Sequence, residues 1–337
     1  MSSALVVLVG IVAVSILHVS FPVVVSWAFL LPFVVLSGTF HSPRWHAGIL
    51  GAALAALVIT SPRVHGATVD VLGPMIAVCA VGSITLWRSM ARARVGVQGT
   101  RGESMLADLR RRLIRQGRMP RLPAPWSGEL CVQPAFGHRF SGDFVVSRRT
   151  REHLLEVMLV DIAGKGMDAG ARSLLLSGGL DALIGIVSPC ELLSAANNYV
   201  LRQDWSDGFA TAVYLTLDLH TGDFSVGRAG HPPVVWYRKA EHEWRIIDGL
   251  CGPVLGLTSS ARYEAFEGRL LPGDALMLYT DGLIEDRGGD LDLGIGRMIT
   301  GLRALSAGGF TGVATRLCGQ AASGEQDDRG VVLLWTD

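Results

Sequence analysis

Hydrophobic residues dominate the first 87 positions of the chain, where Arg44, Arg63 and Asp70 are the only charged residues. Four apolar blocks occupy this stretch, namely residues 5–17, 23–40, 47–60 and 71–87. A membrane-spanning helix needs about 20 mostly apolar residues. The pattern therefore predicts an all-α transmembrane region over residues 1–88. It predicts four spans, or three if one of the two shorter blocks does not cross the bilayer.

A different pattern begins near Trp126, where short apolar runs with polar positions between them indicate strands. Strands are expected over residues 128–136, 142–150, 153–164, 274–282 and 327–337, with a three-strand meander over 209–238. Helices are expected over residues 169–183 and 189–201. Two sheets with helices packed outside them would bury these runs, so the pattern predicts an α+β sandwich over residues 126–337.

A basic segment, residues 89–125, joins these two parts. Leu106, Leu109 and Leu113 repeat at helical spacing, with arginines on the opposite face, and Pro120 ends the pattern. The leucines favour a short helix that dimerises. The arginines favour a helix that rests on anionic lipid headgroups. The sequence leaves both interpretations open.

The charge distribution gives the orientation. The formal net charge is zero, so the total charge does not indicate a nucleic-acid partner. Ten arginines but only two acids lie between Arg88 and Arg121. Positively charged flanks of membrane spans remain in the cytoplasm. We therefore expect a multi-pass protein of the cell membrane with its larger, C-terminal part in the cytoplasm, where its five cysteines, which form no metal-ligand spacing, would be reduced thiols.

Aspartates stand at the ends of the predicted strands. Asp143 begins GDFVV, Asp161 follows the apolar run VMLV, and Asp281 follows LMLYT; Asp327 and Asp328 precede the last strand. A buried carboxylate is costly unless it is paired or bound to a metal, although any one of these aspartates could be an ordinary turn residue. Carboxylates and water suit Mg²⁺ and Mn²⁺. Together the five acids predict a two-metal site that activates a water molecule.

Glycines follow Asp161 in the segment VDIAGKGMDAG. Glycine lets the backbone approach an ion closely, so the carbonyl group of Ile162 is a further candidate ligand. The same segment does not fit a phosphate-binding P-loop, because that motif needs a glycine at Leu159 and a serine or threonine at Gly166.

Seven motifs occur in the order found in SpoIIE/RsbU-type phosphatases: SGDFVV, VDIAGKGMDAG, FATAVYLTLD, RAGHPPVVW, GPVLGL, PGDALMLYTDGLIEDR and DDRGVVLLW. Residues 106–337 thus resemble these bacterial members of the PPM (type 2C) metal-dependent serine/threonine phosphatase superfamily. The resemblance implies a PPM-type β-sandwich flanked by helices and two Mn²⁺ or Mg²⁺ ions. It also implies hydrolysis of phosphoserine or phosphothreonine on a protein, often a small anti-sigma factor antagonist.

The resemblance also implies roles for individual residues. Asp143, Asp161 and Asp281 look like catalytic metal ligands, as does the carbonyl group of Ile162. Of the terminal pair, Asp327 corresponds to the ligand and Asp328 to its neighbour. The helix after Gly166 resembles a regulatory element that moves to complete the metal site. His231, in the turn that resembles AGHPP, is interpreted first as a structural residue.

The sequence departs from the family pattern at three positions. Ser141 replaces a glycine, Val146 replaces an acid, and Asp168 stands where proline is common. Loss of the acid at position 146 raises the prospect of a weaker enzyme. No arginine is assigned to phosphate, although Arg139 and Arg148 lie near Asp143 in the sequence.

The sequence as a whole predicts a membrane-anchored protein serine/threonine phosphatase that uses metal-activated water. The alternative is a membrane receptor whose phosphatase-like domain is catalytically weak or inactive and binds a partner. A transporter would need ionisable residues along a path through the membrane, and only Asp70, near a loop, qualifies.

Overall fold

The structure is a computed structural model with two compact units, Met1–Asp108 and Leu109–Asp337. The described residues are 2–22, 24–64, 72–94, 108, 111, 117–135, 141–164, 167–203, 205, 208–249, 251–285, 290–321, 324 and 326–337. The leucines expected to form a dimerising helix, Leu106, Leu109 and Leu113, lie outside these residues.

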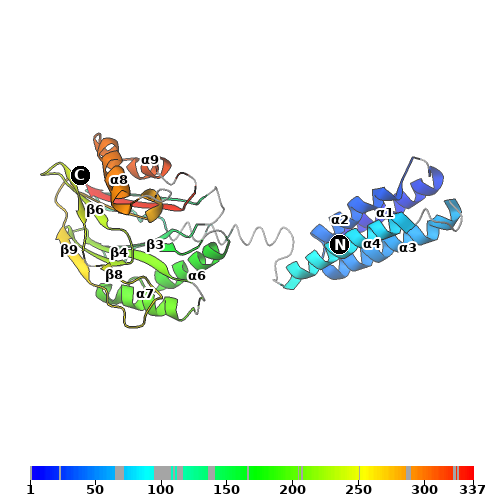
Figure 1. Cartoon of the computed structure of the whole chain (residues 1–337), viewed down its shortest axis with the longest axis horizontal. Helices are drawn as coiled ribbons and strands as arrows, with labels where there is room; N and C mark the ends of the chain where they lie inside the picture. The colour runs from blue at the N-terminus through cyan, green and yellow to red at the C-terminus, as the bar shows by residue number, and fades with distance from the viewer. Residues whose placement is uncertain are drawn as a thin grey trace. The chain divides into compact units, whose positions relative to one another are not determined.

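The first unit is helical (Figure 1). Its elements are α1 (Ser2–Ser20), the 3-10 turn η1 (Trp27–Leu30), α2 (Leu31–Phe40), α3 (Pro43–Val64) and α4 (Leu72–Arg94). Helix α1 packs against α3, and α2 packs against α4. Pro32 lies in the first turn of α2 and Pro43 begins α3. Proline is tolerated at these positions because the first N–H groups of a helix have no partner within it.

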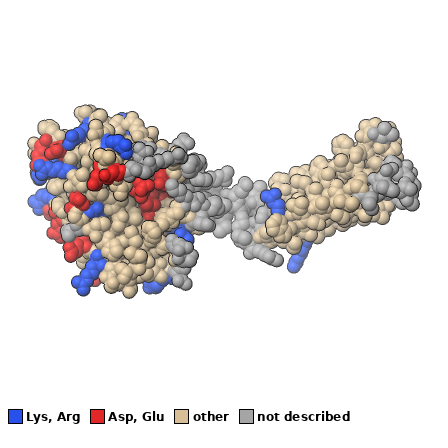
Figure 2. All heavy atoms as spheres, in the orientation of Figure 1, with Lys and Arg blue, Asp and Glu red and all other residues tan. Residues whose placement is uncertain are grey.

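The helical unit is apolar outside as well as inside. Leu30, Val34 and Leu57 are buried in its core, whereas large side chains such as Val9 and Ile84 are more than half exposed. Figure 2 shows almost no acidic or basic side chains on this unit. The four expected helices are present, and α4 continues past residue 88. By length and composition, two of them could cross a membrane, over Pro43–Thr60 and Gly73–Ala91, whereas the apolar parts of α1 and of η1 with α2 are shorter.

The second unit contains two β-sheets. Sheet A has the order β1-β11-β10-β6-β7, and its strands are β1 (Trp126–Gln133), β11 (Arg329–Thr336), β10 (Ala275–Tyr279), β6 (Val234–Arg238) and β7 (Glu243–Ile247). Sheet B has the order β2-β3-β4-β5-β8, with β9 also paired to β5. Its strands are β2 (Phe144–Arg149), β3 (Leu154–Ile162), β4 (Ala210–Asp218), β5 (Asp223–Ala229), β8 (Cys251–Gly252) and β9 (Ala265–Arg269).

Helices cover the outer face of each sheet (Figure 1). The helical elements of this unit are α6 (Met167–Leu183), η4 (Pro189–Glu191), α7 (Leu192–Leu201), η5 (Asp281–Leu283), α8 (Leu291–Ser306) and α9 (Val313–Gly319). Alternate residues of a strand point to opposite faces, so Val157 faces sheet A whereas Met158 packs with α6 and α7. On sheet A, Val332 faces sheet B and Val331 packs with α8 and α9. This layering is the α+β sandwich flanked by helices that the sequence predicts.

The expected three-strand meander is wrong in its third strand. Strands β4 and β5 pair in sheet B, but β6 pairs with β7 and β10 in sheet A. The chain crosses between the sheets at Gly230, His231 and two prolines. Gly230 has a φ of 65°, and proline has no N–H to continue a ladder. The motif that looked like a hairpin turn is therefore a crossover.

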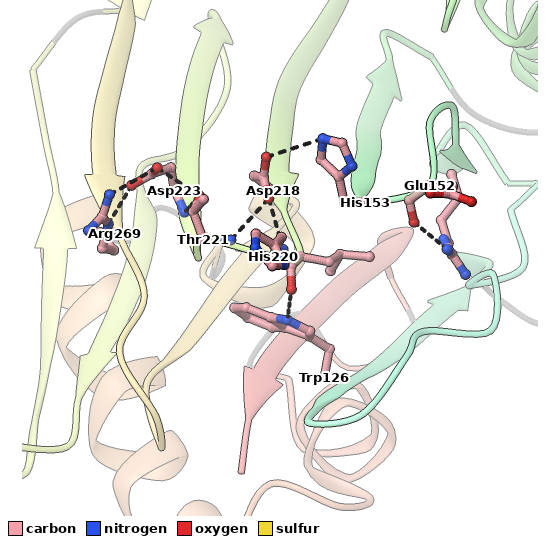
Figure 3. Close-up of polar contacts among 10 residues, drawn as sticks. Trp126, Glu152, His153, Asp218, His220, Thr221, Asp223 and Arg269 are labelled. Carbon is pink, nitrogen blue, oxygen red and sulfur yellow. Dashed lines mark hydrogen bonds and ion pairs between the residues drawn. The ribbon is translucent and has the colours of Figure 1, made fainter.

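The two sheets are joined at the end shown in Figure 3. The indole N–H of Trp126, at the start of β1, donates to the carbonyl oxygen of Leu219 between β4 and β5 at 2.7 Å. Met119 and Leu122, placed by the sequence in the linker, pack against the apolar core between the sheets. The segment before β1 therefore contributes to the sandwich.

Candidate metal centre

The predicted acids lie at the opposite end of the sandwich from Trp126. Strand register shows this: at one end of β4, Thr211 pairs with Asp161, and at the other end Asp218 pairs with Leu154. Asp161 follows Val157 and Leu159 on the face of β3 that points towards sheet A. Its carboxylate is therefore delivered between the sheets where β3 ends.

Asp143, immediately before β2, lies at the same end. Its side chain is buried, and its carboxylate accepts a hydrogen bond from the hydroxyl of Thr280 at 2.7 Å. The same hydroxyl accepts a bond from the N–H of Gly330 at 2.7 Å. The N–H of Asp143 donates to the hydroxyl of Ser141 at 3.1 Å. Asp143 is thus fixed between sheet B and the ends of β10 and β11 in sheet A.

Asp328 is held by backbone groups. One carboxylate oxygen accepts the N–H of Ala135 at 2.6 Å, and the other accepts the N–H of Gly142 at 2.5 Å. Both donors lie more than 180 positions earlier in the chain. Asp327 is less buried than Asp328, and its side chain accepts the N–H of Asp328 at 3.0 Å. The two neighbouring aspartates therefore have different roles. Asp328 joins its own segment of backbone to those of Ala135 and Gly142, whereas the Asp327 side chain accepts a bond from within its own segment.

Asp281 begins η5, one residue beyond Thr280, which follows the end of β10. Its carbonyl oxygen accepts the N–H groups of Ile284 and Glu285 at 2.8 Å. A Cβ atom at the next residue, Gly282, would collide with the carbonyl oxygen of Asp328. Glycine at position 282 therefore allows the turn that carries Asp281 to lie against the loop that carries Asp327 and Asp328.

The backbone after Asp161 also approaches this end. A Cβ atom at Gly142 would lie 3.0 Å from the carbonyl oxygen of Ile162 and 3.2 Å from a carboxylate oxygen of Asp328. The Ile162 carbonyl, a predicted ligand, therefore lies near Asp328 and the loop that carries Asp143. Lys165, Gly166 and the side chain of Asp168 lie outside the described residues.

The acids influence one another electrostatically. Burial and the neighbouring charge of Asp281 raise the pKa of Asp161 to about 7, and Asp327 and Asp328 contribute. Burial and the charge of Asp161 raise the pKa of Asp143 well above its usual range. Like charges this close repel one another, and oxygen donors of this type suit hard divalent cations.

The acids lie at the same end of the sandwich, but their side chains do not surround one common point. Within the described ranges, no three Asp, Glu, His or Cys side chains stand together in a ready-made metal-binding arrangement. The structure nevertheless brings Asp143, Asp161, Asp281, Asp327 and Asp328 to one end of the sandwich. The chemistry of these oxygen donors suits a divalent cation.

Two other predicted positions, Arg148 and Val146, lie apart from this cluster. Arg148 forms an ion pair with Asp181 at 2.9 Å on the α6 side of sheet B, and Arg139 lies outside the described residues. The side chain of Val146 is buried with Met158 in the core beneath α6 and α7. An acid at position 146 would point into that core, because Val146 faces away from sheet A.

His231 is a buried structural residue. Its Nδ1 lies 2.7 Å from the hydroxyl of Thr211, and its carbonyl oxygen accepts a bond from the guanidinium of Arg228 at 3.2 Å. Burial lowers its pKa to about 3. A neutral His231 therefore braces the crossover from β5 to β6, in agreement with the structural interpretation.

Sequence reasoning missed Ser173 and Thr280. The hydroxyl of Ser173, on α6, lies 2.9 Å from the carbonyl oxygen of Ser141 and 3.0 Å from that of Gly142. It thereby connects α6 to the loop that carries Asp143. A single serine inside a helix gives no local signal, because its partners lie about 30 residues away.

Comparisons with known proteins agree with this architecture. The sequence profile of the family described as "Stage II sporulation protein E (SpoIIE)" matches residues 151–336, a range that includes all the candidate acids except Asp143. The phosphoserine phosphatase RsbU of Bacillus subtilis (strain 168) is 25% identical over 150 residues. These residues are 44% of this chain and 44% of RsbU, so the similarity covers less than half of that relative.

Solved structures share the fold of the second unit. The RsbU and RsbW domains of a Mycobacterium tuberculosis protein match with a TM-score of 0.56 and 22% identity, over 66% of this chain and 62% of that chain. The PP2C phosphatase domain of SpoIIE from Bacillus subtilis, with a fragment of its regulatory domain, matches with a TM-score of 0.53 and 17% identity, over 63% and 64% of the two chains. The profile match covers more than half of the chain, which therefore belongs to the SpoIIE family.

Proposed function

We propose that the protein is a metal-dependent protein serine/threonine phosphatase whose catalytic centre is the acid cluster between the sheets. The observation that carries this proposal is the meeting of Asp143, Asp161, Asp281 and the Asp327–Asp328 pair at one end of the sandwich. RsbU, a phosphoserine phosphatase, shares sequence with this unit. The reaction is the hydrolysis of a phosphoserine or phosphothreonine ester.

In this proposal the carboxylates of Asp143, Asp161, Asp281 and Asp327, with the Ile162 carbonyl, hold two Mn²⁺ or Mg²⁺ ions. Bound divalent ions supply an activated water and neutralise charge on the phosphoryl oxygens. The chain's own contribution is to hold these donors in place. Thr280 orients Asp143 through its 2.7 Å hydrogen bond, and burial between the sheets limits access of bulk water.

The pair of terminal aspartates divides its work in this proposal. Both oxygens of Asp328 already accept backbone N–H groups, which makes Asp328 a positioning residue. Asp327 is less buried, and its charge contributes to the raised pKa of Asp161. Asp327 is therefore the better ligand of the two.

The helical unit anchors this centre to the membrane in our proposal. Most of the surface of the two candidate spans is not buried within the unit, and large apolar side chains point outwards from it. Such a surface is costly in water and suits lipid. The arginines between residues 88 and 121 support a cytoplasmic location of the phosphatase unit in this proposal.

Activity is tested with the full chain in detergent, using p-nitrophenyl phosphate and Mn²⁺. We expect Mn²⁺-dependent hydrolysis that is lost in Asp281→Asn and kept in the matched control Asp248→Asn, whose side chain is 84% exposed. Equal rates for the wild type and Asp281→Asn would contradict the proposal and favour a receptor that only binds its partner.

The substrate in this proposal is a small phosphorylated regulatory protein of the anti-sigma factor antagonist type. Phosphoproteomics would compare a deletion strain and an Asp161→Asn strain with their parent. We expect phosphorylation of the same small protein to rise in both strains. A rise in the deletion strain alone would mean that the chain acts on this protein without hydrolysing its phosphate.

A further inference from the structure

Two of the five cysteines meet on the outer face of sheet A. Cys131 belongs to β1, and Cys318 belongs to α9, which packs on β1 and β11. The Cys318 thiol lies 3.8 Å from the carbonyl oxygen of Cys131, and both cysteine side chains pack in the same apolar cluster between sheet A and its helices. Because 187 positions separate them, only the folded sandwich brings them together.

The two thiols are not equivalent. Cys131 is partly exposed at the edge strand of sheet A, whereas Cys318 is fully buried. The hydrogen bond from Cys318 and the charge of Arg329 lower the pKa of Cys131, whereas the contact with Cys131 and burial raise that of Cys318. A thiolate is the reactive form of cysteine, so Cys131 is the nucleophile of the pair and Cys318 is the proton donor.

The pair lies close to the acid cluster. The guanidinium of Arg329 donates to the carbonyl oxygen of Cys318 at 2.8 Å, and Arg329 directly follows Asp328 at the start of β11. The Cys318 thiol also lies 4.0 Å from the carbonyl oxygen of Arg329. A covalent change at this pair would therefore act on the strand that carries the terminal aspartates.

We propose that Cys131 and Cys318 form a reversible disulfide site that a peroxide oxidises. The Cys131 thiolate, which has released its proton, attacks one oxygen of hydrogen peroxide. The O–O bond breaks, a sulfenic acid forms, and the departing hydroxide takes up the released proton to give the first water. The sulfur of Cys318 then displaces the sulfenic oxygen, which leaves as water once protonated by the Cys318 thiol. In sum, two thiols and one peroxide give one disulfide and two waters. Reduction by a small dithiol reverses the change.

The test uses the full chain with the exposed cysteines replaced (Cys79→Ser, Cys190→Ser, Cys251→Ser), so that only Cys131 and Cys318 remain. Limited hydrogen peroxide should remove two free thiols per chain. Mass spectrometry of non-reduced peptides should show the peptides of Cys131 and Cys318 linked, at a mass lower by two hydrogen atoms. Dithiothreitol should restore both thiols.

Two single variants on this background assign the roles. Cys318→Ala should trap Cys131 as a sulfenic acid, detected by dimedone labelling, whereas Cys131→Ser should leave Cys318 unlabelled. Oxidation should also raise the urea midpoint of unfolding, because a disulfide restricts the unfolded chain, and Cys131→Ser should abolish this rise. If both thiols remain free in peroxide, or if the disulfide joins two different chains, the proposal is wrong. These outcomes do not depend on phosphatase activity.

Discussion

Both ends of the β-sandwich carry aspartates, but the contacts and charges around these aspartates differ between the two ends. At the end shown in Figure 3, Asp223 forms an ion pair with Arg269 at 2.5 Å, and Asp218 accepts the N–H groups of the turn that follows it. The pKa of Asp223 is lowered by its hydrogen bond with Arg269. At the other end, burial and like charges raise the pKa of Asp161 to about 7.

This difference teaches how to interpret an aspartate at a strand end. Both ends have the same local sequence character, an apolar run followed by an acid and a turn. The charge of Asp218 is compensated by the N–H groups of the turn that it caps, and the charge of Asp223 is compensated by Arg269. Acids that are buried together raise one another's pKa, and a cation held among them would replace repulsion with attraction.

Substituting acids at the two ends should give the largest contrast. We expect Asp161→Asn and Asp281→Asn to lower the Mn²⁺-dependent phosphatase rate by about 100-fold or more, because even residues behind metal ligands contribute 10–100-fold. Asp218→Asn and Asp223→Asn should stay within about 2-fold of the wild type, since their charges are compensated locally. Steady-state kinetics on one phosphopeptide would measure all four. Comparable losses at both ends would remove the distinction.

Substitutions of Asp327 and Asp328 should differ in their effect on the free energy of unfolding. Asp328→Asn places an amide donor against one of two backbone N–H groups, and we expect the free energy of unfolding to fall by about 1–3 kcal/mol. Asp327→Asn should lose activity without this fall. Urea denaturation of the metal-free protein would measure both variants. If Asp327→Asn proves the less stable of the two, the roles of ligand and positioning residue must be exchanged.

Buried His231 should make the stability of the fold fall in acid. The folded-state pKa of His231 is about 3, below the ordinary value of 6.5. Below pH 6.5 the unfolded chain therefore binds a proton that the folded chain does not, and stability falls as the pH falls. Between pH 6.5 and 5 this amounts to about 2 kcal/mol. His231→Gln should flatten this dependence.

The exposed ion pair should have the smallest effect. Arg269→Ala removes the partner of Asp223 in solvent, where ion pairs contribute little. We expect no measurable change in the urea midpoint or in the phosphatase rate. A clear loss of stability would show that this end of the sandwich depends on its charges as the other end does.

The sequence located much of this arrangement because the signals are local. A run such as Val157–Val160 followed by Asp161 and glycines predicts both the buried strand and the delivered carboxylate. The division between Asp327 and Asp328 could not be decided in this way. It depends on the N–H groups of Ala135 and Gly142, which reach Asp328 only after the two sheets have packed.

Other features depend on contacts that leave no pattern in the sequence. The strand after Pro233 alternates as a meander strand would, and only its pairing with β10 shows that it belongs to sheet A. The short strand β8 has two residues and no periodicity. The hydroxyls of Thr280 and Ser173 bond to groups 137 and 31–32 positions away. Their roles follow from tertiary structure alone.

Strand β11 lies inside sheet A, between the edge strand β1 and β10, and every residue in it is buried. Its neighbour β1 precedes it by about 200 residues of chain. During synthesis, β1 therefore emerges from the ribosome long before the strand that completes its hydrogen bonds. Until then β1 and β10 have no strand between them. The segment after Gly319 supplies both this strand and the last two acids. Assembly of the scaffold and assembly of the acid cluster are thus the same late folding event.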